Sequence, residues 1–238
     1  MKNFYIADLH LGHNNVIRFD GRPFGNAEEM NKKIIENWNK TVTNADKVYI
    51  LGDFVWGNEI NWLETVPKLK GKKILIKGNH DLKQPGPEAR ILFEAITELT
   101  SIDDHGRRVI MCHYAIPFYK NAHRENVYML YGHVHNTREN DFLEKWQCEV
   151  RKSRTESGHA TGNFINVGCM MPWMDYTPRT LDEIIGGFEK YYAMKEEYDS
   201  KIALNAMKRI NDSAKANGTS EMTLDEINEE INSYRKGK

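Results

Sequence analysis

The amino-acid sequence predicts an α/β fold in which two β-sheets pack as a sandwich. In the first half of the chain, three short apolar runs alternate with two helical patterns, a rhythm typical of α/β units. The runs are residues 3–7, 47–51 and 72–76, and the helical patterns are residues 27–42 and 59–69. Later apolar runs have fewer helical patterns between them, which favours a second, more antiparallel sheet. These later runs are residues 108–112, 127–131 and 164–167.

The rest of the chain divides into an insertion and a helical end. Residues 136–162 are polar and irregular, apart from a short amphipathic piece around Phe142, Leu143 and Trp146, and we expect an inserted loop or flap there. From Thr180 the pattern is helical, and Glu183 has the spacing that completes a capping box with it. We therefore expect a main domain over residues 1–187 and a C-terminal helical extension over residues 188–238.

The sequence predicts a last helix that begins at Thr223, where Glu226 completes a second capping box. A narrow apolar seam follows at Leu224, Ile227, Ile231 and Tyr234. Such a seam docks either on its own chain or on another subunit. A homo-oligomer formed through the C-terminal helices is therefore one expectation, and docking within the chain is the other.

Composition excludes several classes of protein. The 238 residues are 40% hydrophobic and 28% charged, without an apolar run long enough to cross a membrane or a signal-like start. Three widely spaced cysteines without a CxxC pair predict neither a disulfide framework nor a thiolate zinc site, and a cytoplasmic location is expected. The formal net charge of -1 gives no general attraction for polyanions, so nucleic acid is not an expected partner.

Side chains that bind metals recur where the apolar runs end. Asp8 and His10 follow the first run, and an extended backbone would point both side chains the same way. The other positions, in chain order, are Asp53, Asn79, His80, Asp81, His113, His133 and His135. Loops at the carboxyl edge of parallel strands form the ligand crevice of α/β sheets. We therefore expect these side chains to converge there.

The chemistry of these side chains indicates which ions they bind. Carboxylate oxygens, imidazole nitrogens and an amide oxygen, without thiolates, suit manganese, iron, zinc, nickel or cobalt better than calcium or magnesium. Seven candidate ligands are too many for one tetrahedral site, namely Asp8, His10, Asp53, Asn79, His113, His133 and His135. They fit two divalent ions that share a carboxylate, an arrangement used in phosphoryl displacement.

The full series resembles the motif set of the calcineurin-like metallophosphoesterases. Its parts are Asp8-Leu9-His10, Gly52-Asp53, Gly78-Asn79-His80-Asp81, His113 and Gly132-His133-Val134-His135. Each part alone is weak evidence, but the set is highly specific and spans residues 1–167. Flanking residues, such as Arg22-Pro23-Phe24, resemble a small bacterial and phage branch of the superfamily. One departure is Ala115 directly after His113-Tyr114, where the family has proline, and it affects the shape of the loop rather than the ligand.

The resemblance implies a four-layer α/β/β/α sandwich of two mixed sheets and an allocation of ligands. Asp8, His10 and His135 would hold the first metal. Asn79, His113 and His133 would hold the second metal, and Asp53 would bridge both. His80 would be the catalytic histidine outside the ligand set, with Asp81 as its orienting partner.

The function expected from this resemblance is hydrolysis of a phosphodiester or phosphomonoester by a metal-bridging hydroxide, with manganese as the favoured metal. The expected partner is a small phosphate ester rather than a membrane. Two alternatives remain: a metal-stabilised interaction scaffold without catalysis, and a nuclease. The nuclease is disfavoured because no basic stripe with interleaved aromatic residues is present.

Three polar residues near the first motif are candidate substrate contacts. Asn14, Arg18 and Arg22 lie within fourteen residues of Asp8, and arginine can bind phosphate through two parallel hydrogen bonds. Structural roles are the competing interpretation, because loop hydrogen bonds and surface ion pairs are the commoner use of such residues.

Overall fold

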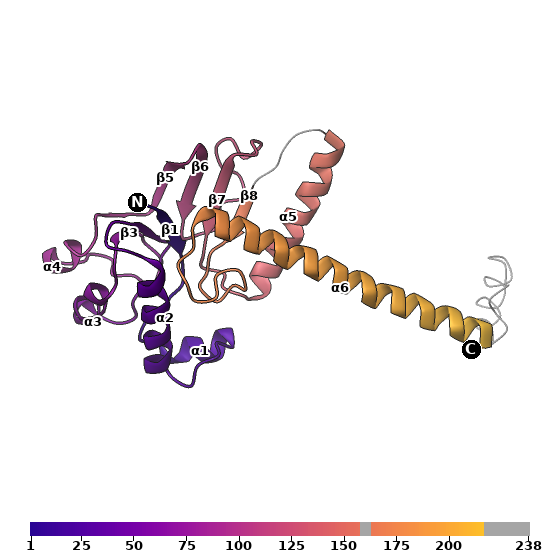
Figure 1. Ribbon diagram of the computed structural model, residues 1–238, viewed down its shortest axis with the longest axis horizontal. Helices are drawn as coiled ribbons and strands as arrows, with labels where there is room; N and C mark the ends of the chain where they lie inside the picture. Colours follow the sequence, from indigo (N-terminus) through magenta and orange to yellow (C-terminus); the bar gives the residue numbers. More distant parts are fainter. Residues whose placement is uncertain (158–162, 217–238) are drawn as a thin grey trace, which may run out of the picture. The chain divides into compact units, whose positions relative to one another are not determined.

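The computed structural model describes residues 1–157 and 163–216, which form two four-stranded sheets and their flanking helices (Figure 1). Sheet 1 contains, in spatial order, β1 (Asn3–Ile6), β2 (Lys47–Ile50), β3 (Lys72–Ile76) and β4 (Ala95–Thr97). Sheet 2 contains β5 (Leu99–Asp104), β6 (Arg107–Cys112), β7 (Val127–Tyr131) and β8 (Asn163–Asn166). The two-sheet α/β fold expected from the sequence is thus confirmed.

Strand directions differ in part from the expectation. All pairs of sheet 1 are parallel, and in sheet 2 only β5 and β6 pair antiparallel. The two-residue connection between β5 and β6 permits a hairpin, whereas β7 and β8 are each reached by a long crossover, which produces parallel pairing. Sheet 2 is therefore less antiparallel than the sparse helical patterns suggested.

Two of the helices on the side of sheet 1 begin at well-formed caps. The side chain of Asn26 accepts a hydrogen bond from the backbone N–H of Glu29 at the start of α2 (Ala27–Thr41). The buried positions of α2 recur every three or four residues. Asn58 forms a capping box at α3 (Glu59–Thr65), which continues into a short 3₁₀ helix, η1 (Val66–Lys68). Two short helices that the sequence did not predict complete this region: α1 (Asn14–Asp20) and α4 (Pro87–Arg90).

A twenty-residue helix, α5 (Arg138–Ser157), occupies most of the segment expected to be irregular. Trp146 packs against Phe164 of β8, with ring centroids 5.9 Å apart, and the side chain of Gln147 donates to the carbonyl of Phe164. The helix was missed because it buries polar side chains such as Asn140 and Gln147, so that its sequence lacks the usual apolar periodicity. The insertion is thus a helix packed on sheet 2.

The two sheets are joined through buried polar contacts at β1. The hydroxyl of Tyr5 donates to Asp104 of β5 over 2.8 Å, and Asn3 donates to the same carboxylate over 2.9 Å. Beyond the end of β1, Ala7 bonds through its backbone to Val167 and Cys169, just after β8. These contacts fix the ends of β1 and β8 side by side.

The chain divides into two compact units, residues 1–189 and 190–238. Helix α6 (Leu181–Ala216) starts in the first unit, where Thr180 donates to Glu183 as the predicted capping box requires. Its later turns carry exposed apolar side chains, including Tyr198, Ile202 and Ile210. The helix predicted from Thr223 lies outside the described residues, and oligomerisation stays a prediction. Among the helices that the structure describes, none combines the length and apolar character of a membrane span.

Candidate metal centre

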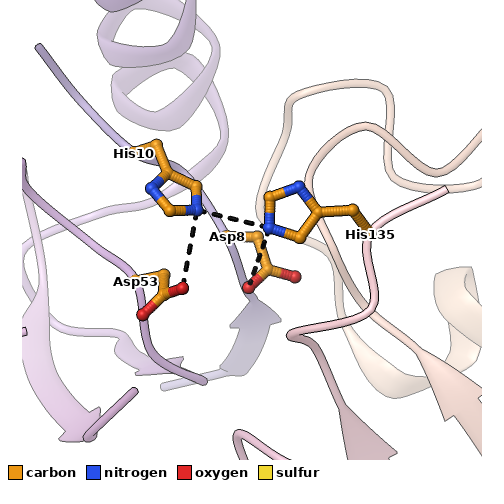
Figure 2. Close-up of side chains that lie close together, drawn as sticks. All are labelled: Asp8, His10, Asp53 and His135. Carbon is orange, nitrogen blue, oxygen red and sulfur yellow. Dashed lines mark hydrogen bonds and ion pairs between the residues drawn. The ribbon is translucent and has the colours of Figure 1, made fainter. Parts of the chain in front are cut away.

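The predicted ligands converge where the strands of both sheets end. Asp8, His10, Asp53 and His135 form one group whose ligand atoms all lie within 4.8 Å of one another, and Asp53, His113 and His133 form a second. Figure 2 shows the first group, with the imidazoles of His10 and His135 turned toward the two carboxylates. Asn79 adjoins the second group, because its Oδ1 lies 3.0 Å from His113 Nε2. Asp53 belongs to both groups, as the resemblance implied for a bridging residue.

The backbone turns sharply at most of these positions. Five candidate ligands have left-handed backbone angles, namely Asp8 (φ 55°), His10 (φ 49°), Asp53 (φ 50°), His133 (φ 71°) and His135 (φ 49°). The extended backbone expected at Asp8 and His10 is therefore wrong, and a turn at each residue directs its side chain inward. Such conformations are uncommon outside glycine and cluster at functional sites.

Two glycines let the second and third motifs touch through their backbones. A Cβ at Gly52 (φ 81°) would lie 2.7 Å from the Gly78 backbone, and one at Gly78 would lie 2.7 Å from the amide nitrogen of Asp53. Real Cβ atoms do not approach other atoms this closely. Glycine at both positions therefore allows Asp53 and Asn79 to reach the same centre.

Hydrogen bonds orient the imidazoles of His113 and His135. Nδ1 of His113 donates to the carbonyl of Leu51 over 2.8 Å, and Nδ1 of His135 donates to the carboxylate of Asp20 over 2.8 Å. Nε2 is then the atom that each ring presents to the centre. Nε2 of His113 lies 3.6 Å from Asp53 Oδ2, and Nε2 of His135 lies 3.3 Å from Nε2 of His10. This arrangement, with an acceptor behind each ring, is typical of metal-binding histidines.

The electrostatics fit divalent cations. Asp8 and Asp53 are almost fully buried, and within residues 1–157 and 163–216 their ion-pair partners are histidines rather than lysine or arginine. Burial raises the pKa of Asp8 above its ordinary value. Burial and the neighbouring His135 lower the pKa of His10 to about 2, so that its imidazole is neutral. Buried carboxylates and neutral imidazoles are the ligand forms that such cations require.

His80 and Asp81 do not form the expected pair. The His80 side chain is exposed, and its ring centroid lies 5.5 Å from that of His10. Asp81 is buried, and its carboxylate accepts the backbone N–H groups of Asp53, Phe54 and Gly78 over 2.8–3.0 Å. In the described part of the chain, no hydrogen bond joins Asp81 to His80. Asp81 therefore holds the two loops together rather than orienting the imidazole.

Arg22 is a support of the first ligand loop rather than a substrate contact. Only 4% of the residue is exposed, and its guanidinium donates to the carboxylate of Asp20 and to the carbonyls of Asp8 and Leu9 over 2.8–3.0 Å. The guanidinium thus faces protein groups instead of solvent. The proposed role of Arg22 in gripping phosphate is accordingly wrong.

Asn14 and Arg18 are also turned to local contacts. The side-chain oxygen of Asn14 accepts the amide of Ala27 over 2.7 Å, which ties α1 to the start of α2. The guanidinium of Arg18 lies over the ring of its neighbour Phe19, 5.6 Å from the centroid. Substrate binding by these two residues stays a prediction.

Sequence reasoning missed two residues that support His135. Asp20 accepts its Nδ1–H, as described above, and the side chain of Asn166 donates to its backbone carbonyl over 2.9 Å. Asn166 also accepts the amide of Gly168 and donates to Asn140 at the start of α5. Neither residue stands in a ligand motif, and the one available signal for Asp20 was its place two residues before Arg22-Pro23-Phe24, a segment that resembles the family.

Comparison with known proteins agrees with this geometry. The sequence profile of the calcineurin-like phosphoesterase superfamily domain matches residues 1–181. The chain belongs to this superfamily. Family membership and the two ligand groups together support a metal-dependent phosphoesterase in general terms.

Individual relatives add little about activity. A segment of 82 residues is 43% identical to the uncharacterized protein MJ1445 of Methanocaldococcus jannaschii, covering 34% of this chain and about half (47%) of that protein. The crystal structure of AQ665 from Aquifex aeolicus, a protein of unknown function, is 27% identical with a TM-score of 0.56, covering 77% of this chain and 97% of that one. YfcE, a phosphoesterase from E. coli, is 18% identical with a TM-score of 0.34, covering 57% and 70%.

Proposed function

We propose that this superfamily member is a dinuclear metal-dependent hydrolase of a small phosphodiester or phosphomonoester, with manganese as the favoured metal. Asp8, His10 and His135 would hold one ion, Asn79, His113 and His133 the other, and Asp53 would serve both. When bound, the two ions supply an activated water and offset negative charge on the phosphate oxygens.

The main support for this proposal is the position of Asp53. Its Oδ2 lies 3.5 Å from Nε2 of His10 and 3.6 Å from Nε2 of His113, so that one oxygen reaches toward both groups. Its Oδ1 accepts the backbone N–H of His80 over 2.9 Å, which fixes the plane of the carboxylate. A shared carboxylate is the feature that distinguishes a two-ion centre from two separate sites.

His80 is the proposed general acid. It belongs to neither ligand group, it is exposed at the rim, and its ring lies beside that of His10. From there the imidazole can donate a proton to the leaving oxygen of an ester whose phosphate sits at the centre. The hydrogen bond from the backbone N–H of His80 to Asp53 holds the loop that carries His80 next to the two ligand groups.

The test of the shared carboxylate is Asp53→Asn. The amide has the shape of the carboxylate but lacks the negative charge that lets two cations lie side by side, so we expect bound manganese and the hydrolysis of bis-p-nitrophenyl phosphate to fall together. Metal content and initial rates measure this. Absence of turnover by the unchanged protein with every divalent metal tried would contradict the enzyme and favour a metal-stabilised scaffold.

The role of His80 is separable from metal binding. We expect His80→Ala to keep both ions but to slow turnover by about 10²–10⁴-fold, the usual size of a general acid–base contribution. The loss should be smaller for a p-nitrophenolate leaving group, which needs little protonation, than for an alkoxide. Metal analysis and rates on two such esters provide the measurement. Loss of metal as severe as in Asp53→Asn would instead make His80 a ligand.

A further inference from the structure

A partly exposed tryptophan lies beside the proposed general acid. Trp56 follows the second ligand motif, and its ring centroid is 5.1 Å from that of His80 and 6.4 Å from that of His10. The residue is 38% exposed, whereas Trp38 and Trp62 are fully buried in the core. Core packing therefore does not account for the position of this indole.

His13 fixes the orientation of the indole. The two rings are parallel within 3°, with centroids 3.8 Å apart, so the imidazole covers one face of Trp56. The backbone of Trp56 is held as well, because its N–H donates to the carbonyl of Leu11 over 2.9 Å. Since the imidazole of His13 covers one face of Trp56, a ligand could stack only on the opposite face of the indole. The indole is thus a fixed flat surface at the rim of the centre.

We propose that Trp56, supported by His13, is a stacking subsite for a planar ring carried by the leaving group, and that the substrates are nucleoside phosphate esters. The inference rests on the proposed function, because it takes His80 as the group next to the leaving oxygen. A substituent on that oxygen would lie next to His80, and the indole of Trp56 adjoins His80 with ring centroids 5.1 Å apart. A nucleobase has the flat π-face that stacks on an indole, whereas a sugar phosphate or an alkyl ester has none.

The matched pair of adenosine 5′-monophosphate and ribose 5-phosphate isolates the ring. Both have a ribose 5′-oxygen as leaving group, so that the demand on His80 is the same and the adenine ring is the main difference. With the full-length manganese-loaded protein, we expect kcat/KM for the adenosine ester to be higher by about 5–150-fold, the range that base stacking on an aromatic side chain provides. Phosphate release measures both rates.

Substitutions of Trp56 test whether the preference for the adenosine ester depends on the indole. Trp56→Leu should abolish the preference, so that the adenosine ester and ribose 5-phosphate are hydrolysed with the same kcat/KM, because stacking acts on the adenine ring alone. Trp56→Phe should keep part of the preference, since a smaller ring remains. The control is Phe118→Leu, which removes an aromatic side chain that is 87% exposed and packs on Trp146 rather than on a candidate ligand, and it should retain the full preference.

Failure of the subsite and failure of the proposed activity give different results. If the unchanged protein hydrolyses other esters but does not prefer the adenosine ester, or if the preference survives in Trp56→Leu, the subsite is wrong. If it hydrolyses no ester, the activity is wrong, and calorimetric titration of the metal-loaded protein with the same two compounds tests the subsite alone. Equal binding of the two compounds, or binding of neither, would then overturn it.

Discussion

Single residues outside the ligand motifs orient His135, one of the candidate metal ligands. Asp20 lies between two partners: it accepts Nδ1–H of His135 over 2.8 Å, and it is held by Arg22 at 2.7 Å. Burial alone would lower the pKa of His135, but the hydrogen bond to Asp20 and the charge of Asp8 raise it above its ordinary value. A carboxylate behind an imidazole fixes the ring and makes it a stronger ligand.

Asp20→Asn should therefore weaken one metal site. We expect manganese affinity at pH 8 to fall by about 10–100-fold, the usual effect of losing such a partner. The carboxylate of Asp20 raises the pKa of His135, so Asp20→Asn should lower that pKa. Protons should then compete with the metal for His135 only at lower pH. Calorimetric titration at several pH values measures both effects. Glu36→Gln, which changes an exposed carboxylate on α2, is the control, and equal affinities in the two variants would contradict the argument.

The convergence of the candidate ligands could be predicted from the sequence, but the residues that support them could not. Asp8, Asp53 and His113 each follow an apolar run, and the ends of such strands meet at one edge of the sheet. Asp20 and Arg22 belong to a short helix and its exit, without a periodic pattern to place them. Their roles depend on contacts between residues far apart in the chain, which spacing alone does not encode.

At the scale of elements, the junction between the sheets depends on a buried polar contact. Tyr5 of β1 is fully buried and donates to Asp104 of β5, while stacking on Tyr49 of β2 with centroids 5.5 Å apart. Asp104 is buried too, so its carboxylate relies on the hydroxyl of Tyr5 and the amide of Asn3. A buried carboxylate that loses a donor is costly.

Tyr5→Phe should lower stability without changing the metal centre. Removing the hydroxyl leaves Asp104 short of one donor, and hydrogen bonds to charged groups contribute about 1.5–3 kcal/mol. We expect the free energy of unfolding in urea to fall by that amount, with manganese content unchanged. Tyr49→Phe keeps the Tyr5–Asp104 bond and serves as the control. An equal loss in the two variants, or no loss in Tyr5→Phe, would show that the hydrogen bond to Asp104 does not hold the sheets together.

Apolar elements were predictable, and the polar helix was not. The last three residues of β2 and of β3 are apolar and buried on both faces of the sheet, so composition indicates these strands directly. Helix α5 contacts sheet 2 through Trp146 and the polar side chain of Gln147, and its mean hydropathy is low. A periodic pattern of apolar residues reveals a helix that buries apolar side chains. It does not reveal a helix that is held in part by hydrogen bonds from polar side chains.

In the whole molecule, the metal centre is a second junction between the sheets. Loops after β1, β2 and β3 supply Asp8, His10, Asp53 and Asn79, and loops after β6 and β7 supply His113, His133 and His135. Five of these residues hold uncommon backbone angles, which cost stability unless the surroundings compensate. Ions that bind both sets of loops would stabilise the folded chain, because the unfolded chain does not present the ligands together.

Binding of metal should therefore raise the melting temperature of the protein. A metal concentration 100 times the dissociation constant stabilises the folded state by about 2.7 kcal/mol per site. For a chain of this size that corresponds to a rise in Tm of roughly 5–11 °C per site over protein in chelator.

The sign of the pH dependence follows from the ligand pKa values. The raised pKa of His135 means that its proton competes with the metal up to a pH above the ordinary histidine range, so the rise in Tm should be larger at pH 8 than at pH 6. Calorimetric melting with manganese or chelator at both pH values gives the measurement. Tyr5→Phe should melt lower but keep the full rise, whereas Asp53→Asn should lose most of it. A rise in Tm that is equal at both pH values, or that persists in Asp53→Asn, would place the stabilising ion somewhere other than between these loops.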